Sequence, residues 1–136
     1  MLAKDANGES GVQGCNLSEI DGAKCNTREE LLQACKAASI IGTLQAGYTN
    51  FKYLGESTKR IFEREALIGV GITGWMNNPE ILFNEQNMKE GAEEVKKWNK
   101  IVAKLIGINP AARTTVVKPS GNASVLLGCA SGIHGE

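Results

Sequence analysis

The chain has 136 residues, 42% of them hydrophobic, and its 15 basic residues balance 15 acidic ones. This length suits one compact domain without an internal boundary over residues 1–136. The balanced charge argues against a nucleic-acid polymer or a membrane surface as partner. No apolar run approaches the roughly 20 residues that span a bilayer. The start MLAKDANGES has no hydrophobic signal core, so we expect a cytoplasmic protein.

The N-terminal third predicts a loop, a strand and a helix. Residues 1–14, rich in Gly, Asp, Asn and Ser, are typical of a loop. The half-apolar segment CNLSEI (15–20) indicates a strand. Thr27 and Glu30 form a capping box, in which each side chain accepts from a free backbone N–H of the first helical turn. The apolar face of that helix is expected at Leu31, Cys35, Ala38, Ile41 and Leu44 (or Gln45).

The remaining elements alternate between helix and strand. The first helix should end near Gly47, and a shorter one is predicted over 57–65. LIGVGITGW (67–75) predicts a buried strand, whose glycines suit close approach of other backbone or of a ligand. A longer amphipathic helix is expected over 87–106, and a strand over 113–118. This alternation predicts an α/β layer structure with largely parallel strands. The apolar stripe of the longer helix is expected at Met88, Ala92, Val95, Trp98, Val102 and Leu105.

The segment PSGNAS (119–124) raises the sharpest question about function. Pro119 ends the hydrogen bonding of the preceding strand, Gly121 permits unusual backbone angles, and small residues leave N–H groups open. Several such donors aimed at one point, before a helix, can hold an anion. The same composition is also common in ordinary turns. On local chemistry alone both interpretations stay open.

The four cysteines, Cys15, Cys25, Cys35 and Cys129, form neither a CxxC motif nor a Cys/His cluster. With a single histidine in the chain, we expect no metal site. Cys35 lies on the apolar face of its helix and is expected in the core. Cys15 is either a small buried residue or a redox thiol that needs a second cysteine nearby. His134 is either a general base or, more often for a lone histidine, a packing or surface residue.

Four segments occur in an order that resembles the catalytic subunit of ribonucleotide reductase. They are GCNLSEI, a helix reaching GTLQAGYTNF, REALIGVGITGW, and INPAARTTVVKPSGNASVLLGCASGIHGE. The resemblance covers nearly the whole chain from Gly14 onward. CNLSEI and KPSGNASVLLG, followed by SGIH, are its strongest motifs. The chain is most similar to the adenosylcobalamin-dependent class, of the ribonucleoside-triphosphate reductase type.

The resemblance implies the second half of a ten-stranded α/β barrel that converts ribonucleotides to deoxyribonucleotides by thiyl-radical chemistry. The radical cysteine of the family lies in an Asn-x-Cys-x-Glu pattern, which residues 1–14 lack and which we expect a few residues upstream. Adenosylcobalamin is implied as cofactor, bound mainly by parts outside this chain. The implied partners are a ribonucleoside tri- or diphosphate, a thioredoxin-like reductant and the remainder of the reductase chain. We therefore expect a truncated or split reductase that is inactive alone.

The resemblance also assigns site residues. Cys15 matches one of two cysteines that reduce the substrate and close to a disulfide. The family's loop that holds the substrate phosphates through N–H groups and hydroxyls corresponds to Ser120, Gly121, Asn122, Ala123 and Ser124. Many relatives carry a hydroxyl residue after the glycine of this loop. This chain has Asn122 and then Ala123 there, so we expect backbone contacts at these two positions.

Three alternatives stay open on the sequence. The catalytic subunit of the metal-dependent reductase class has the same barrel and phosphate loop. A free-standing phosphate- or nucleotide-binding module would use the loop without any redox role for Cys15. A non-functional remnant would bind nothing.

Overall fold

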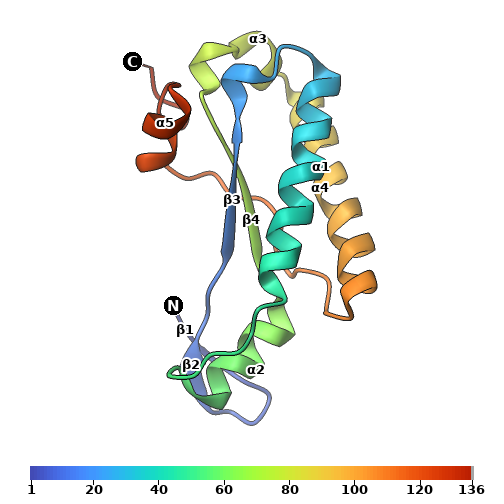
Figure 1. Cartoon of the computed structure of the whole chain (residues 1–136), viewed down its shortest axis with the longest axis vertical. Coiled ribbons are helices and arrows are strands. Elements are labelled where there is room, and N and C mark those ends of the chain that lie inside the picture. The colour runs from blue at the N-terminus through green and yellow to red at the C-terminus, as the bar shows by residue number, and fades with distance from the viewer. Residues whose placement is uncertain (136) are drawn as a thin grey trace.

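A computed structural model describes residues 1–135 as a mixed α/β structure, which confirms the predicted class. Its main layer is a narrow sheet covered on one side by two long helices (Figure 1). The helices are α1 (Arg28–Ala46), α2 (Gly55–Glu65), α3 (Pro79–Leu82), α4 (Glu85–Ile106) and α5 (Asn122–Leu127). The strands are β1 (Leu2–Lys4), β2 (Ser10–Val12), β3 (Asn16–Asp21) and β4 (Ile68–Thr73), and short 3-10 turns occupy Gly22–Lys24 and Trp75–Asn77.

The central sheet pairs β3 and β4 in parallel, with Asn16 opposite Ile68 and Asp21 opposite Thr73. The predicted strand over 113–118 is much shorter than expected. It makes a single parallel bridge to β4, between Thr115 and Val70. Backbone hydrogen bonds of 3.0–3.3 Å still hold residues 113–116 along β4. The last of these bonds runs from the N–H of Val116 to the carbonyl oxygen of Val70, three residues before Pro119.

The two long helices form the second layer. The capping box of α1 is confirmed, since the Thr27 hydroxyl accepts from the N–H of Glu30 and the Glu30 carboxylate accepts from the N–H of Thr27. The prediction of its apolar face is correct at Leu31, Cys35 and Ala38, which are buried, and wrong further along the helix. The later buried positions of α1 are small or polar, namely Ser39, Gly42, Thr43 and Ala46, whereas Ile41 and Leu44 are exposed.

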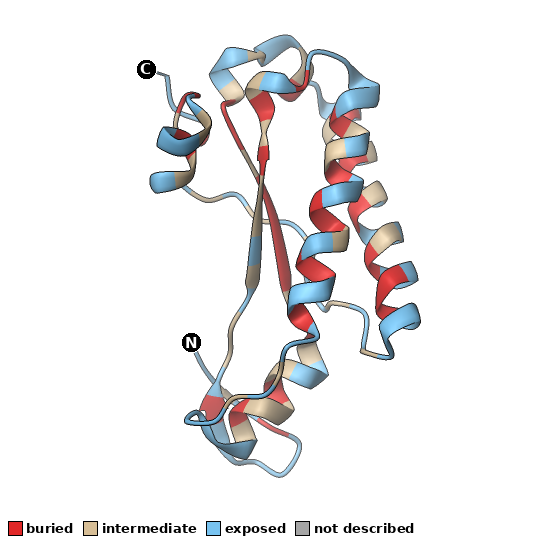
Figure 2. Ribbon diagram, in the orientation of Figure 1, coloured by how far each residue is buried: buried red, intermediate tan, exposed pale blue. Residues whose placement is uncertain are grey.

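This difference has a physical cause in how closely α1 is packed. A Cβ added at Gly42 would lie 3.4 Å from the Cβ of Ile68 on β4, so the helix approaches the sheet closely there. Side-chain hydrogen bonds then replace part of the apolar contact with α4. The Ser39 hydroxyl donates to the carbonyl oxygen of Val95, and the Asn99 amide donates to the Thr43 hydroxyl. Figure 2 shows the buried residues along the facing sides of the two helices. On α4, Leu105 of the predicted apolar stripe is also exposed.

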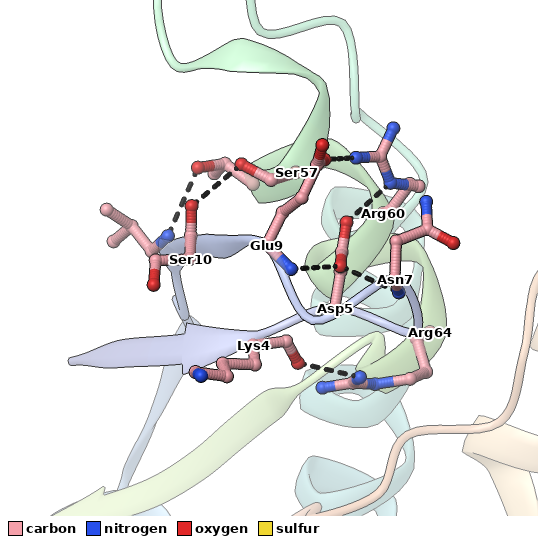
Figure 3. Close-up of polar contacts among 10 residues, drawn as sticks. Lys4, Asp5, Asn7, Glu9, Ser10, Ser57, Arg60 and Arg64 are labelled. Atoms are coloured by element: carbon pink, nitrogen blue, oxygen red, sulfur yellow. Dashed lines mark hydrogen bonds and ion pairs between the residues drawn. The ribbon is translucent and has the colours of Figure 1, made fainter.

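The first 14 residues form a β-hairpin and not the predicted loop. β1 and β2 pair antiparallel, and the hairpin packs against α2 (Figure 3). Asp5 is the centre of this contact: its carboxylate accepts from the N–H groups of Asn7 and Glu9 and forms an ion pair with Arg60 at 2.7 Å. Composition alone favoured a loop, because the pairing depends on α2, which lies some 50 residues later in the chain.

The helices of the described residues do not include one with the length and apolar character needed to cross a membrane.

Candidate functional site

The sheet has one face that the long helices do not cover (Figure 1). Alternation along the strands turns every second side chain toward it. We call it the open face and define it by Cys15, Leu17, Glu19, Gly69, Gly71, Val116 and Lys118. α1 and α4 cover the opposite face, where Ile68 and Val70 are buried.

Glycines on β4 allow neighbouring side chains to meet on the open face. A Cβ at Gly69 would lie 2.6 Å from Leu17 Cδ2, 3.0 Å from Cys15 Sγ and 3.1 Å from Val116 Cγ1. These side chains therefore occupy the space that a larger residue would fill. The glycines of LIGVGITGW are predicted to admit other backbone or a ligand, and at Gly69 the structure shows side chains of adjacent segments there instead.

A charged pair crosses the same face. The Lys118 ammonium group forms an ion pair with the Glu19 carboxylate on β3. The Lys118 side chain crosses Gly71 to reach Glu19, and a Cβ added at Gly71 would lie 3.5 Å from Lys118 Cε. Both side chains are largely buried, Glu19 being 11% and Lys118 23% exposed. The pair thus ties β3 to the residue that leads directly into Pro119.

The loop 119–124 turns directly into α5. The Ser120 hydroxyl accepts from the N–H of Ser124 at 3.0 Å, and the Ser124 hydroxyl donates to the carbonyl oxygen of Gly121 at 3.0 Å. Both serines are buried. Their hydroxyls therefore hold the loop in shape and are not free to face solvent.

The middle of this loop is accessible. Gly121 and Asn122 are exposed and Ala123 is half-buried. Within the described residues, the backbone N–H groups of these three positions have no hydrogen-bond acceptor. A Cβ built on Gly121 would meet no atom within 4 Å. The donors that these three positions offer to an anion are their backbone N–H groups and the exposed side-chain amide of Asn122.

The later motif SGIH supports the loop from behind. The Ser131 hydroxyl donates to the carbonyl oxygen of Ser120. Gly132 donates its N–H to the Thr73 hydroxyl at 2.9 Å and accepts from the N–H of Trp75 at 3.2 Å. Its φ of +56° favours glycine, and an added Cβ would lie 3.3 Å from the Lys118 carbonyl oxygen. The end of β4 therefore fixes SGIH, and SGIH fixes the loop.

The cysteines differ in accessibility. Cys15 is exposed, while Cys25, Cys35 and Cys129 are buried, and all four are free thiols. Partial burial of the Cys15 sulfur raises its pKa, so it is a thiol at neutral pH. Burial, with smaller contributions from Cys25 and Glu94, raises the pKa of Cys35 to about 12, which agrees with the predicted core position. Burial and the nearby Asp21 carboxylate also raise the pKa of Cys129.

The structure brings together some residues that the sequence singled out and separates others. Cys15 and the loop both border the open face, Cys15 at the start of β3 and the loop at the far end of the sheet. His134 is exposed at the C-terminal end and stays without an assigned role. Sequence reasoning missed Glu19, Lys118 and Ser131. The available signal was the position of Lys118 immediately before the Pro-Ser-Gly turn.

Adenosylcobalamin is expected to be bound mainly by parts outside this chain. Within residues 1–135 there is no group of three histidine, cysteine or carboxylate side chains that could hold a metal ion. Three cavities of the described residues have volumes of about 290, 390 and 270 Å³. These are small for a corrinoid, so we derive no chemical step that involves this cofactor.

Comparisons of the chain with protein-family models, with curated proteins and with solved structures found no match.

Proposed function

We propose that this chain is the second half of the catalytic barrel of a ribonucleotide reductase, with the open face turned toward the substrate. One observation carries the proposal: an accessible cysteine and a loop of accessible backbone donors border the same uncovered sheet face. The resemblance of CNLSEI and KPSGNAS to the reductase motifs supports the same two positions. In this proposal the absent strands complete the barrel on the edges of β3 and of segment 113–118.

The spacing suits an extended nucleotide. Cys15 packs over Gly69, and the loop is held at Ser120 by Ser131, whose neighbour Gly132 donates to the Thr73 hydroxyl, four residues further along β4. At about 3.3 Å per residue, these four residues span on the order of 13 Å. A ribonucleoside di- or triphosphate can lie along the open face with its phosphates at the loop and its ribose toward Cys15.

The residues have distinct chemical roles in this proposal. The N–H groups of Gly121, Asn122 and Ala123 donate to phosphate oxygens, which places no demand on their side chains. Cys15 and a second thiol from outside this chain supply two electrons and two protons. The ribose C2′–OH bond breaks, a C2′–H bond forms, water leaves, and the two sulfurs join as a disulfide. The raised pKa of Cys15 keeps the proton on sulfur until it is needed.

A binding experiment tests the part of this proposal that the chain can show alone. Titration of the isotopically labelled chain with CDP and CTP, followed by NMR, should shift the amide signals of Gly121, Asn122 and Ala123. Signals of residues around Cys15 should also shift with the nucleotides but not with inorganic tripolyphosphate. Shifts confined to the loop with all three ligands would favour a phosphate-binding module without redox function. Absence of any shift in the folded chain would contradict the proposal.

Sequencing of the flanking DNA separates the remaining alternatives. Codons for Asn-x-Cys-x-Glu just upstream in the same reading frame would support the reductase. A tyrosine pair encoded beyond Glu136 would favour the metal-dependent class over the cobalamin-dependent one.

A further inference from the structure

The Glu19–Lys118 ion pair lies on a face of two parallel strands, and parallel sheets usually carry apolar side chains on both faces. Surface ion pairs contribute little to stability, but this pair is mostly removed from water. Such pairs are often no better for stability than well-packed apolar residues of the same size, because both charges lose hydration. Stability alone therefore does not explain why the open face carries charges here.

The pair is also incompletely satisfied. One oxygen of Glu19 contacts the Lys118 ammonium group, whereas the other, Oε1, is buried without a hydrogen-bond partner in the part of the chain that the structure describes. An unpartnered buried oxygen costs free energy. The ion pair thus carries a desolvation cost at Glu19 Oε1 that a pair of apolar side chains would not have.

The position of Lys118 gives the pair a consequence for the loop. Lys118 directly precedes Pro119 and Ser120, and its side chain reaches back over Gly71 to β3. The hydrogen bond from Ser131 holds the other side of the same backbone at Ser120. The first residues of the loop are therefore held from two directions, by β3 through Glu19 and by the SGIH segment through Ser131.

We propose that Glu19 is a positioning residue: it holds Lys118 across Gly71 and thereby fixes the loop 120–124 in its anion-binding shape. The anion-binding part of this inference rests on the proposed function, while the effect on the loop does not. Lys118 acts through its backbone, because its charge is already matched by Glu19.

Amide hydrogen exchange of the full chain, measured by NMR at fixed pH, tests the effect on the loop. Glu19→Gln removes the charge with little change of size, and Lys118→Met removes the other partner. In each variant we expect the Ser124 N–H, which donates to Ser120, to exchange at least tenfold faster than in the unchanged chain. Amides of β4 and α1 should be unaffected. Lys96→Met, which breaks the exposed pair with Glu93, is the matched control and should leave the loop unchanged.

The exchanged pair Glu19→Lys with Lys118→Glu tests how Lys118 acts. We expect the double variant to regain both slow Ser124 exchange and the affinity for CDP that either single variant loses. Unchanged Ser124 exchange in folded Glu19→Gln and Lys118→Met would overturn the inference. Recovery of slow exchange without recovery of affinity would also overturn it, because Lys118 would then bind the anion directly. If the unchanged chain binds neither CDP nor tripolyphosphate, the proposed function fails, and the exchange rates alone decide the positioning role.

Discussion

The hydroxyl of Ser131 donates a hydrogen bond to the carbonyl oxygen of Ser120, 11 residues earlier in the chain. This contact joins the two halves of the most specific motif, KPSGNAS and SGIH, across α5. Because Ser120 in turn accepts from Ser124, the three serines form one support for the loop.

Ser131→Ala should loosen this support. Loss of one such hydrogen bond costs about 1 kcal/mol, so we expect a small drop in stability by urea unfolding and a clear increase in exchange of the Ser124 amide. Ser57→Ala is a suitable control, because it removes a comparable side-chain donation, to Ser10 in the distant hairpin. Equal effects of the two variants on the loop would contradict the role of Ser131.

Gly121→Val should block anion binding while the fold is retained. The space around Gly121 is empty in the chain itself, so an added side chain meets no atom of the chain within 4 Å. The same side chain would project where phosphate approaches the loop N–H groups. We expect at least tenfold weaker CDP binding, which is about 1.4 kcal/mol, by titration calorimetry of a variant with unchanged circular dichroism.

Gly132→Val provides the contrast to that variant. Its φ is +56° and its added Cβ would lie 3.3 Å from the Lys118 carbonyl oxygen. We expect this substitution to lower the melting temperature, whereas Gly121→Val should not. CDP affinity that is unchanged in folded Gly121→Val would count against the loop as the anion site.

Acid should detach the N-terminal hairpin from α2. Burial acts to raise the pKa of Asp5, but hydrogen bonds from Arg60 and from the N–H groups of Glu9 and Asn7 outweigh it and hold the pKa below its ordinary value of 3.8. The ionised Asp5 carboxylate therefore stabilises the docked hairpin at pH values above 3.8. This contribution is lost as the pH falls below 3.8 and through the lowered pKa.

The measurement is the pH dependence of NMR signals from the hairpin, between pH 6 and pH 2. Asp5→Asn keeps an acceptor for the two N–H groups but removes the charge opposite Arg60, so its hairpin should already be weakened at pH 6. A hairpin that stays docked in this variant at every pH would show that Asp5 does not determine the contact.

The isolated chain should be marginally stable or prone to associate. β3 and segment 113–118 each present an outer edge in the part of the chain described, and unpaired edges favour pairing with other chains. Exposed Leu17, Val117 and Leu126 add apolar surface. A cooperative melt of a monomer above about 60 °C, high for a mesophile domain, would show instead a self-sufficient domain.

Local patterns in the sequence predicted the central elements well. The capping box at Thr27 and Glu30, and the apolar run at 67–75, depend on neighbours within a few residues, and the structure confirms both. Helix α4 likewise follows from its periodic stripe. The predicted helix over 57–65 corresponds to α2.

The errors share a cause, since each depends on a distant segment. The hairpin at residues 2–12 requires α2, and the exposure of Ile41 depends on how α1 sits against β4 and α4. At the site, the cysteine and the loop could be found from their motifs. The Glu19–Lys118 contact could not, because it joins residues 99 positions apart across a glycine.

The redox role of Cys15 is the central claim, and the most direct test is multiple-turnover deoxyribonucleotide formation. A chimaeric cobalamin-dependent reductase would carry residues 15–135 in place of its own corresponding segment, with an external thiol reductant supplied. We expect Cys15→Ser to abolish turnover per folded enzyme while nucleotide binding persists, because a hydroxyl cannot form the disulfide that supplies the electrons. Cys35 is buried on α1, where it faces α4. Cys35→Ser should therefore lower stability without loss of turnover per folded enzyme. If Cys15→Ser keeps more than about half of the unchanged turnover, Cys15 is only a packing residue of the sheet.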